Sequence, residues 1–241
     1  MFNALVVVAA LVAGGIASIA GFGIGSILTP LLAAKLGTKL AVAAVSIPHL
    51  LGTGLRLFLT RQHVNPRVLW TFGVTSAVGG LGGALLRVYF TSTVLGYLLG
   101  ALLVFAGVTG LTGLASRIRF GRRSAWVAGG LSGAFGGLVG NQGGIRSAAM
   151  LAFDVPKEAF IATATAIGLG VDVARMPVYA ATQWAQITQV WVLIIIAAAG
   201  IIAGTLLGKP ILRSIPEALF RRVVAVLILA LGLSMLIHPG R

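Results

Sequence analysis

The chain has 241 residues, of which 58% are hydrophobic and only 9% are charged. Because about 25% of the residues in a typical soluble domain are charged, this composition excludes a soluble protein and indicates one embedded in a lipid bilayer. The 18 basic residues outnumber four acids, but they fall mostly between apolar segments, as topology signals do, so no nucleic-acid partner is expected.

Eight apolar segments follow one another, and six of them suit a simple crossing, which needs about 20 residues. In order they are 2–34, 40–60, 68–90, 94–114, 126–153, 159–181, 190–212 and 218–237. A basic loop, with Arg117, Arg119, Arg122 and Arg123, separates the fourth from the fifth. We expect one compact membrane domain made of a first repeat at 1–116, a cytoplasmic loop at 117–123 and a second repeat at 124–241.

We expect two repeats because residues of the first half match residues of the second half at a nearly constant offset. At an offset of 119 residues, Gly14, Gly21, Gly25 and Arg56 match Gly133, Gly140, Gly144 and Arg175. At an offset of 121 residues, Trp70, Gly79 and Gly83 match Trp191, Gly200 and Gly204. This ordered series predicts a duplicated unit of four helical elements.

The first element of each half does not fit a simple crossing. A straight helix over 2–34 would be about 50 Å long, whereas the hydrocarbon core is about 30 Å thick. Glycines interrupt its middle at 21–25, and Pro30 follows. We predict a re-entrant hairpin here and another over 126–153, although that segment could also span with tilt.

The basic residues favour two re-entrant hairpins over eight full crossings. With hairpins, one side receives eleven of them: Arg61, Arg67, Arg117, Arg119, Arg122, Arg123, Lys157, Lys209, Arg213, Arg221 and Arg222. The other side keeps four: Lys35, Lys39, Arg87 and Arg241. Cytoplasmic loops carry such an excess. The expected fold is therefore all-α, with three transmembrane helices and one hairpin in each of two inverted repeats, and with both termini outside.

The stretch from Gly136 to Ser147 carries the strongest functional signal. It combines five glycines with Arg146 and the amides Asn141 and Gln142 inside an apolar segment. Broken backbone and charge at membrane depth are tolerated where they face protein or a cavity. We predict that Arg146 binds an anion together with the tip of a broken helix: Gly140, Asn141, Gln142, Gly143 and Gly144. The alternative is a glycine-rich helix crossing, with Arg146 reaching one membrane surface.

Two further arginines, Arg56 and Arg175, occupy matching positions in the repeats. His49 lies on the helix face of Arg56, and Asp172 lies three residues before Arg175, where the two can pair. In one interpretation both arginines flank an anion pathway, and Asp172 or His49 carries a proton. In the other, both arginines extend to the membrane surface and Asp172 merely neutralises Arg175.

The first hairpin supplies weaker candidates for the opposite wall of the site. These are Gly21, Gly23, Gly25 and Thr29. The GxxxG spacings of Gly79 with Gly83 and of Gly200 with Gly204 favour close helix packing within the chain, and a homodimer face is the alternative.

Signals for an enzyme are weak. The Gly-x-Ser-Gly around Ser132 matches the motif of an intramembrane serine protease. That mechanism needs a histidine base at membrane depth. The only histidine that follows Ser132 is His238, which we expect at the membrane interface, beyond the last apolar segment. The chain contains no cysteine and no P-loop, and its acids are scattered. We expect no catalytic residues, metal or other cofactor.

Two motifs resemble a known family. The sequence AGFGIGSILTP at 20–30 and the sequence GGLVGNQGGIRS at 136–147 resemble the glycine signatures of the TauE/SafE sulfite exporters. The resemblance covers nearly the whole chain, although Gly23-Ile24-Gly25 replaces a fuller glycine run and Ala149 stands where the first half has Pro30. It implies a bacterial inner-membrane permease for sulfite, sulfoacetate or related organosulfonates.

Together these observations predict a secondary transporter that exports a small sulfur-containing anion by alternating access. Its partners would be the anion, the lipid bilayer and protons. The alternatives are uptake of the same or another oxyanion, and a membrane scaffold that transports nothing.

Overall fold

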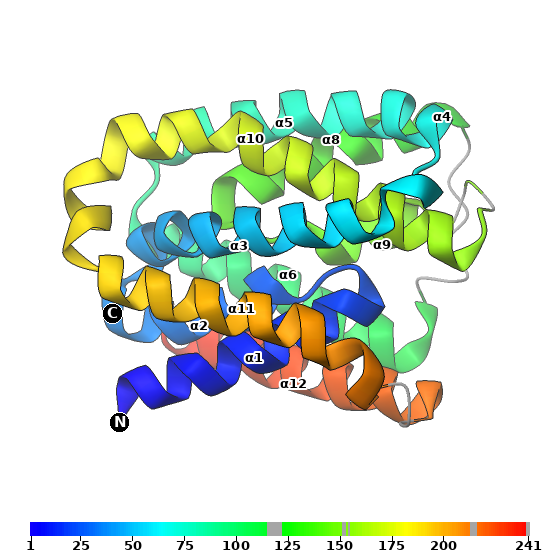
Figure 1. The fold of residues 1–241 in the computed structure, drawn as a ribbon. Coiled ribbons are helices and arrows are strands. Elements are labelled where there is room, and N and C mark those ends of the chain that lie inside the picture. The colour runs from blue at the N-terminus through cyan, green and yellow to red at the C-terminus, as the bar shows by residue number, and fades with distance from the viewer. Residues whose placement is uncertain (115–121, 151–152, 154, 213–215, 240–241) are drawn as a thin grey trace.

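The computed structural model describes residues 1–114, 122–150, 153, 155–212 and 216–239, which form helices and no strand (Figure 1). The main helices are α1 (Phe2–Ala20), α2 (Ile24–Leu36), α3 (Thr38–Thr60), α5 (Val74–Leu86), α6 (Ser92–Thr112), α8 (Arg122–Val139), α9 (Gly143–Met150), α10 (Lys157–Gln189), α11 (Trp191–Leu212) and α12 (Glu217–Ile237). The shorter ones are η1 (Arg61–His63), α4 (Pro66–Val68), the π-helical η2 (Leu69–Gly73) and η3 (Arg87–Tyr89). Four residues counted in the charge argument lie outside the described residues: Arg117, Arg119, Arg213 and Arg241.

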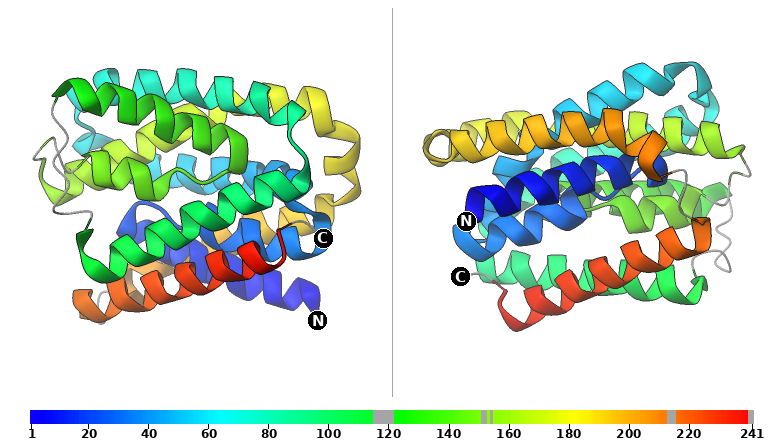
Figure 2. Two further views of the ribbon diagram at one scale, coloured as in Figure 1. Left: turned by 180° about the vertical axis from the view of Figure 1, so that it is seen from behind. Right: turned by 60° about the horizontal axis from the view of Figure 1, so that its bottom comes forward.

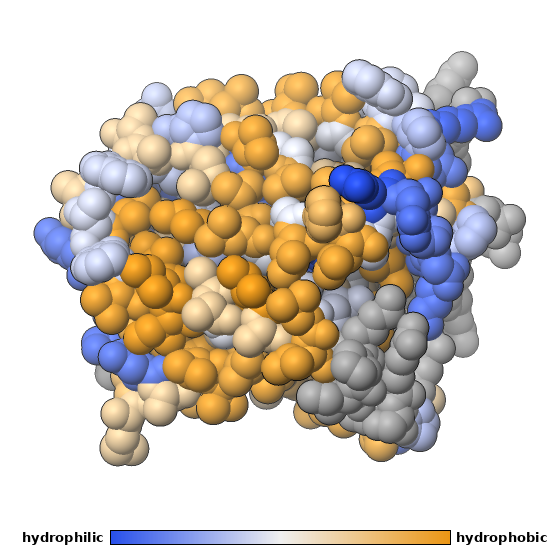
Figure 3. Space-filling model, in the orientation of Figure 1, coloured by the Kyte–Doolittle hydropathy of each residue, from blue (hydrophilic) through white to orange (hydrophobic). Residues whose placement is uncertain are grey.

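Seven helical segments in the described part of the chain are long and apolar enough to cross a membrane. A broad apolar band covers the face seen in Figure 3, and hydrophilic residues gather toward its two edges. The chain is therefore a multi-pass membrane protein. Six of these segments are the expected crossings, and the seventh is α1, the first arm of the predicted hairpin.

Both glycine-rich segments are broken helices that turn back. Helix α1 ends before Gly21 and α2 begins at Ile24, and the ammonium of Lys35 near the end of α2 lies 4.8 Å above the ring of Phe2 at the start of α1. In the second half, Met150 near the end of α9 packs in one cluster with Ala128 near the start of α8. In each pair the second helix therefore returns to the end of the bundle where the first began (Figures 1 and 2).

Each hairpin packs its first arm against a helix of the other half. Gly14 of α1 faces the backbone of Ile201 and Thr205 in α11, and Gly133 of α8 faces the backbone of Ser76 in α5. The GxxxG glycines of α5 and α11 lie at these crossings, so they serve packing within the chain. The division into inverted repeats stays a prediction that this reciprocal packing supports.

The crossing of α5 and α8 gives a matched test of small-residue packing. A Cβ added at Gly83 would overlap the backbone of Ala134, whereas a Cβ added at Gly82 meets no atom within 4 Å. Gly83→Ala should destabilise the protein by about 1–3 kcal/mol, as overpacking does. Gly82→Ala should leave it unchanged or stabilise it by up to about 1 kcal/mol. Thermal unfolding in detergent measures both, and equal tolerance of the two variants would refute this packing.

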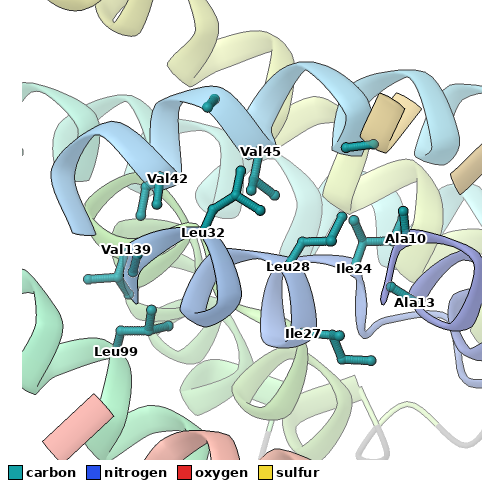
Figure 4. Packing of buried hydrophobic residues seen from close by; sticks show 14 of the residues in the cluster. Ala10, Ala13, Ile24, Ile27, Leu28, Leu32, Val42, Val45, Leu99 and Val139 are labelled. Carbon is teal, nitrogen blue, oxygen red and sulfur yellow. The ribbon is translucent and has the colours of Figure 1, made fainter. Parts of the chain in front are cut away.

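Helix α2 is the centre of the larger apolar core. Figure 4 shows Ile24, Leu28 and Leu32 spaced four residues apart on α2, with Leu32 toward Val45 of α3 and Ile24 toward Ala10 of α1. This packing holds a helix too short to cross the membrane inside the bundle. It fixes the start of α2 in the interior of the protein.

The start of α1, the end of α12 and the α2–α3 turn lie at one end of the bundle, which we call the terminal end (Figures 1 and 2). Thr38 at this turn donates a 3.2 Å hydrogen bond from Oγ1 to the carbonyl of Pro239. The ammonium of Lys39 donates to the carbonyls of Val88 and Phe90, in the link to α6. The chain enters and leaves the α8–α9 hairpin at the opposite end.

Candidate functional site

Glycines make both breaks because the backbone there adopts positive φ. Gly21 and Gly23 have φ values of 77° and 131°, and Gly140 has a φ of 72°. L-residues with a Cβ rarely adopt such angles. The breaks therefore fall at the predicted glycines, with the new helices beginning at Ile24 and Gly143.

The two hairpin tips meet inside the bundle. Ser26 donates a long hydrogen bond of 3.5 Å from Oγ to Oδ1 of Asn141, across the two tips. A Cβ added at Gly25 would lie 2.5 Å from the carbonyl oxygen of Gly140. Both α2 and α9 start at these tips, so the positive ends of two helix dipoles face the interior. Helix N-termini of this kind favour anions.

Arg146 is buried, with 3% of its surface exposed, so the alternative of a side chain that reaches the membrane surface is wrong. Its Nη2 donates a 3.3 Å hydrogen bond to the carbonyl of Gly21, which joins α9 to the other tip. Its Nε and Nη1 have no hydrogen-bond partner. A Cβ added at Gly168 would lie 2.8 Å from Nη1, so the glycine leaves room for the guanidinium.

Arg56 and Arg175 are also buried, with 3% and 2% of their surfaces exposed, so neither reaches the membrane surface. Arg56 donates from Nε to Oγ1 of Thr165 at 2.9 Å, and its Nη1 has no partner. Arg175 donates from Nη1 to the carbonyl of Gly136 at 2.6 Å. The latter bond ties α10 to α8 just before the second break.

Asp172 links α10 to α3. Its Oδ1 accepts a 2.7 Å hydrogen bond from Nη2 of Arg175, which confirms the predicted pair. Its Oδ2 lies 2.6 Å from Nδ1 of His49, and that nitrogen lies 3.3 Å from Oγ1 of Thr53. The carboxylate is fully buried, whereas 15% of the His49 side chain is exposed. His49 is therefore the more accessible member of a buried hydrogen-bonded chain.

Positive charge is in excess at this site. Arg56 and Arg146 interact electrostatically with each other and with Asp172, and Arg175 bonds to that same carboxylate. One aspartate therefore faces three arginines. Buried charges without compensation are costly, and forked guanidinium groups bind oxyanions well. The arrangement can hold a small anion.

The remaining predicted residues divide into two groups. Thr29 Oγ1, Asn141 Nδ2 and Gln142 Oε1 are buried without a hydrogen-bond partner, so they offer polar atoms near the tips. Gly143 and Gly144 face Phe22 and Ala106 instead, and Gly23 faces Ile16, so these three shape the hairpins by close packing.

Ser132, the serine of the protease-like motif, has a packing role. It is fully buried and donates from Oγ to the carbonyl of Gln142 at 3.2 Å. This bond holds the second tip against α8. Among the described residues, no hydrogen bond joins a histidine to Ser132, and His49 is engaged with Asp172 instead.

The structure adds residues that the sequence motifs did not single out. Thr165 orients Arg56, and Tyr179 of α10 donates from its hydroxyl to the carbonyl of Gly137. Asp172, Arg175 and Tyr179 follow one another at helical spacing, and Gln183 continues the row. This row of polar residues on one helix face was the signal available in the sequence.

The fold and the site define a multi-pass membrane protein with a buried cationic cluster beside the tips of two broken helices. A comparison with protein families finds a match over residues 6–235 to the family described as sulfite exporter TauE/SafE. The chain belongs to this family, whose members are transporters rather than enzymes. Neither a curated protein nor a solved structure matches it.

Proposed function

We propose that the protein exports a small sulfur-containing anion, namely sulfite, sulfoacetate or a related organosulfonate, across the bacterial inner membrane by alternating access. The observation that carries this proposal is the buried excess of arginine beside the tips, with unpaired N–H groups on Arg146 and Arg56. Burying N–H groups without a hydrogen-bond acceptor costs free energy, and a bound anion would supply the acceptor. A scaffold has no need of such groups. The family match supplies the sulfur-containing class.

The His49–Asp172 pair supports proton coupling. Asp172 is fully buried, and the more exposed His49 lies in direct contact with it. Histidine changes charge near physiological pH. A proton that enters this hydrogen-bonded pair would change the charge that the anion meets.

The test is flux of labelled sulfite in proteoliposomes of known orientation, with protein-free liposomes as the control. We expect saturable flux that sulfoacetate inhibits and that an imposed pH gradient drives against the sulfite gradient. Accumulation of sulfite only on the side that corresponds to the cytoplasm would show that the protein takes sulfite up and does not export it. Absence of flux with sulfite and with labelled organosulfonates would refute transport and favour a scaffold.

A glycine pair on α10 tests the site by a change that removes none of its polar groups. A methyl group at Gly168 would press on Nη1 of Arg146, whereas one at Gly170 meets no atom within 4 Å. Gly168→Ala should raise the KM for sulfite about tenfold, since misplaced binding groups cost affinity, and Gly170→Ala should leave it unchanged. Equal KM values in the two variants would show that Arg146 does not bind the anion.

A further inference from the structure

A polar cavity lies at the terminal end of the bundle, away from the hairpin tips. Its volume is about 240 Å³. Its polar lining comes from Lys39, Arg87, Thr182, Gln183 and Gln186. Sites for drug-sized ligands begin at roughly 300 Å³, so the size suits a small ion.

Arg87 is buried beside this cavity without a counter-charge. Only 2% of its surface is exposed. Its Nη2 donates to the carbonyl of Lys39 and, at 2.9 Å, to Oε1 of Gln183, while its Nε has no partner. The ammonium of Lys39 donates to two carbonyls of the η3–α6 link. No ion pair to either cation occurs within the described ranges.

The ring of Tyr179 contacts both Arg87 of this cavity and Arg175 of the central site. The guanidinium carbon of Arg87 lies 4.4 Å from the centre of the Tyr179 ring, and that of Arg175 lies 5.6 Å from the same centre. Tyr179 itself is 1% exposed. Because Arg175, Tyr179 and Gln183 recur at helical spacing, they extend one polar face of α10 toward the terminal end.

Helix α10 is distorted where it meets this cavity. Gln183 has non-helical angles, with φ at −138° and ψ at 15°. It is the residue that accepts the hydrogen bond from Arg87. Figure 1 shows the last part of α10 turning away beyond the body of the helix. The backbone therefore bends at the contact that orients Arg87.

We propose that Arg87 and Lys39 form a second anion site, which the transported anion occupies on its way between the central site and the terminal end, with Tyr179 as the barrier between the two. The proposal rests on the transport function above. The free Nε of Arg87 would donate one charge-assisted hydrogen bond to a sulfonate or sulfite oxygen. Lys39 adds a second positive charge at the cavity.

The absence of cysteine from the chain permits a direct test. A single Thr182→Cys substitution places a thiol on the cavity wall. Its reaction with a sulfonate-bearing methanethiosulfonate is compared with its reaction with a trimethylammonium-bearing one. We expect the anionic reagent to react faster, and the ratio of rates to fall about tenfold with Arg87→Gln, since a cationic cleft concentrates anions. Lys39→Gln should lower the ratio as well, which provides a second variant if Arg87→Gln folds poorly.

Protection by sulfoacetate tests whether an organosulfonate occupies the cavity. The control is a thiol at Thr112→Cys, near the end of α6. Arg87→Gln should leave the ratio of reaction rates at this control thiol unchanged. Sulfoacetate should slow the reaction at Thr182→Cys, and should still do so with Arg146→Gln. A ratio unaffected by both Arg87→Gln and Lys39→Gln, or no protection, would overturn the second site even if flux is normal. Protection without flux of any organosulfonate would instead leave the second site standing and refute the transport function.

Discussion

Arg146→Gln should reach the membrane in the normal amount and bind sulfite about 10- to 100-fold more weakly than the wild type. Hydrogen bonds to a charged group contribute about 1.5–3 kcal/mol, and each 1.4 kcal/mol changes affinity about tenfold. The two unpaired nitrogens of Arg146 are the donors that this substitution removes. The concentration dependence of sulfite flux, with membrane amounts matched, measures the loss.

Stability separates binding from a structural role in the same variant. The side chain of Arg146 makes one hydrogen bond, to Gly21, and lies in electrostatic contact with Arg56 and Asp172. Removing its charge should therefore leave the thermal midpoint of the protein without anion unchanged or raise it. Arg146→Lys keeps the charge but lacks the fork, so its affinity should lie between the two. Wild-type affinity in Arg146→Gln, or a large fall in stability, would show that Arg146 serves the fold.

Asp172→Asn should cause the largest loss of stability among the site variants. Its carboxylate is fully buried and bonds to both Arg175 and His49. Breaking a buried ion pair costs about 3–5 kcal/mol, because the partner charge stays buried without compensation. We expect a correspondingly lower midpoint of thermal unfolding in detergent.

The double variant Asp172→Asn with Arg175→Gln provides the control. Removing both charges removes the uncompensated guanidinium, so the double variant should be more stable than the sum of the two single effects predicts. The coupling should fall within the roughly 0.5–3 kcal/mol measured for directly interacting residues. Additive effects would mean that the two residues act independently, contrary to the 2.7 Å hydrogen bond between them.

The hairpins were predictable because glycine is a local signal. Positive φ at Gly21 and Gly140 requires the residue type found there, and the 33-residue segment at 2–34 is too long for one crossing. The partner helices were not predictable. Nothing local in the sequence states that α1 packs on α11, since this depends on how the small residues of distant helices fit together.

The charges of the central site were predictable for a different reason. An arginine at membrane depth must face protein or water, and this rule led to Arg56, Arg146 and Arg175, although it left open whether they reach the surface. Their partners come from segments far apart in the chain. His49 meets Asp172 across 123 residues, and the sequence offers no spacing that relates them.

Arg87 shows the limit of the same rule. Its position at a helix end suggests a topology signal at the membrane surface. The structure buries it instead, since the distortion of α10 at Gln183 brings an amide oxygen to its guanidinium. The sequence does not mark this bend, since residue 183 is a glutamine and not a proline.

The most direct measurement for the central claim is the position of a bound anion. Selenite resembles sulfite and carries a strong anomalous scatterer, so a crystal of the protein grown with selenite would locate the anion by its selenium signal. We predict a selenium peak beside the two hairpin tips, placed so that a selenite oxygen lies within hydrogen-bonding distance of Nε or Nη1 of Arg146. Selenium peaks confined to the surface, with none beside Arg146, would contradict the account.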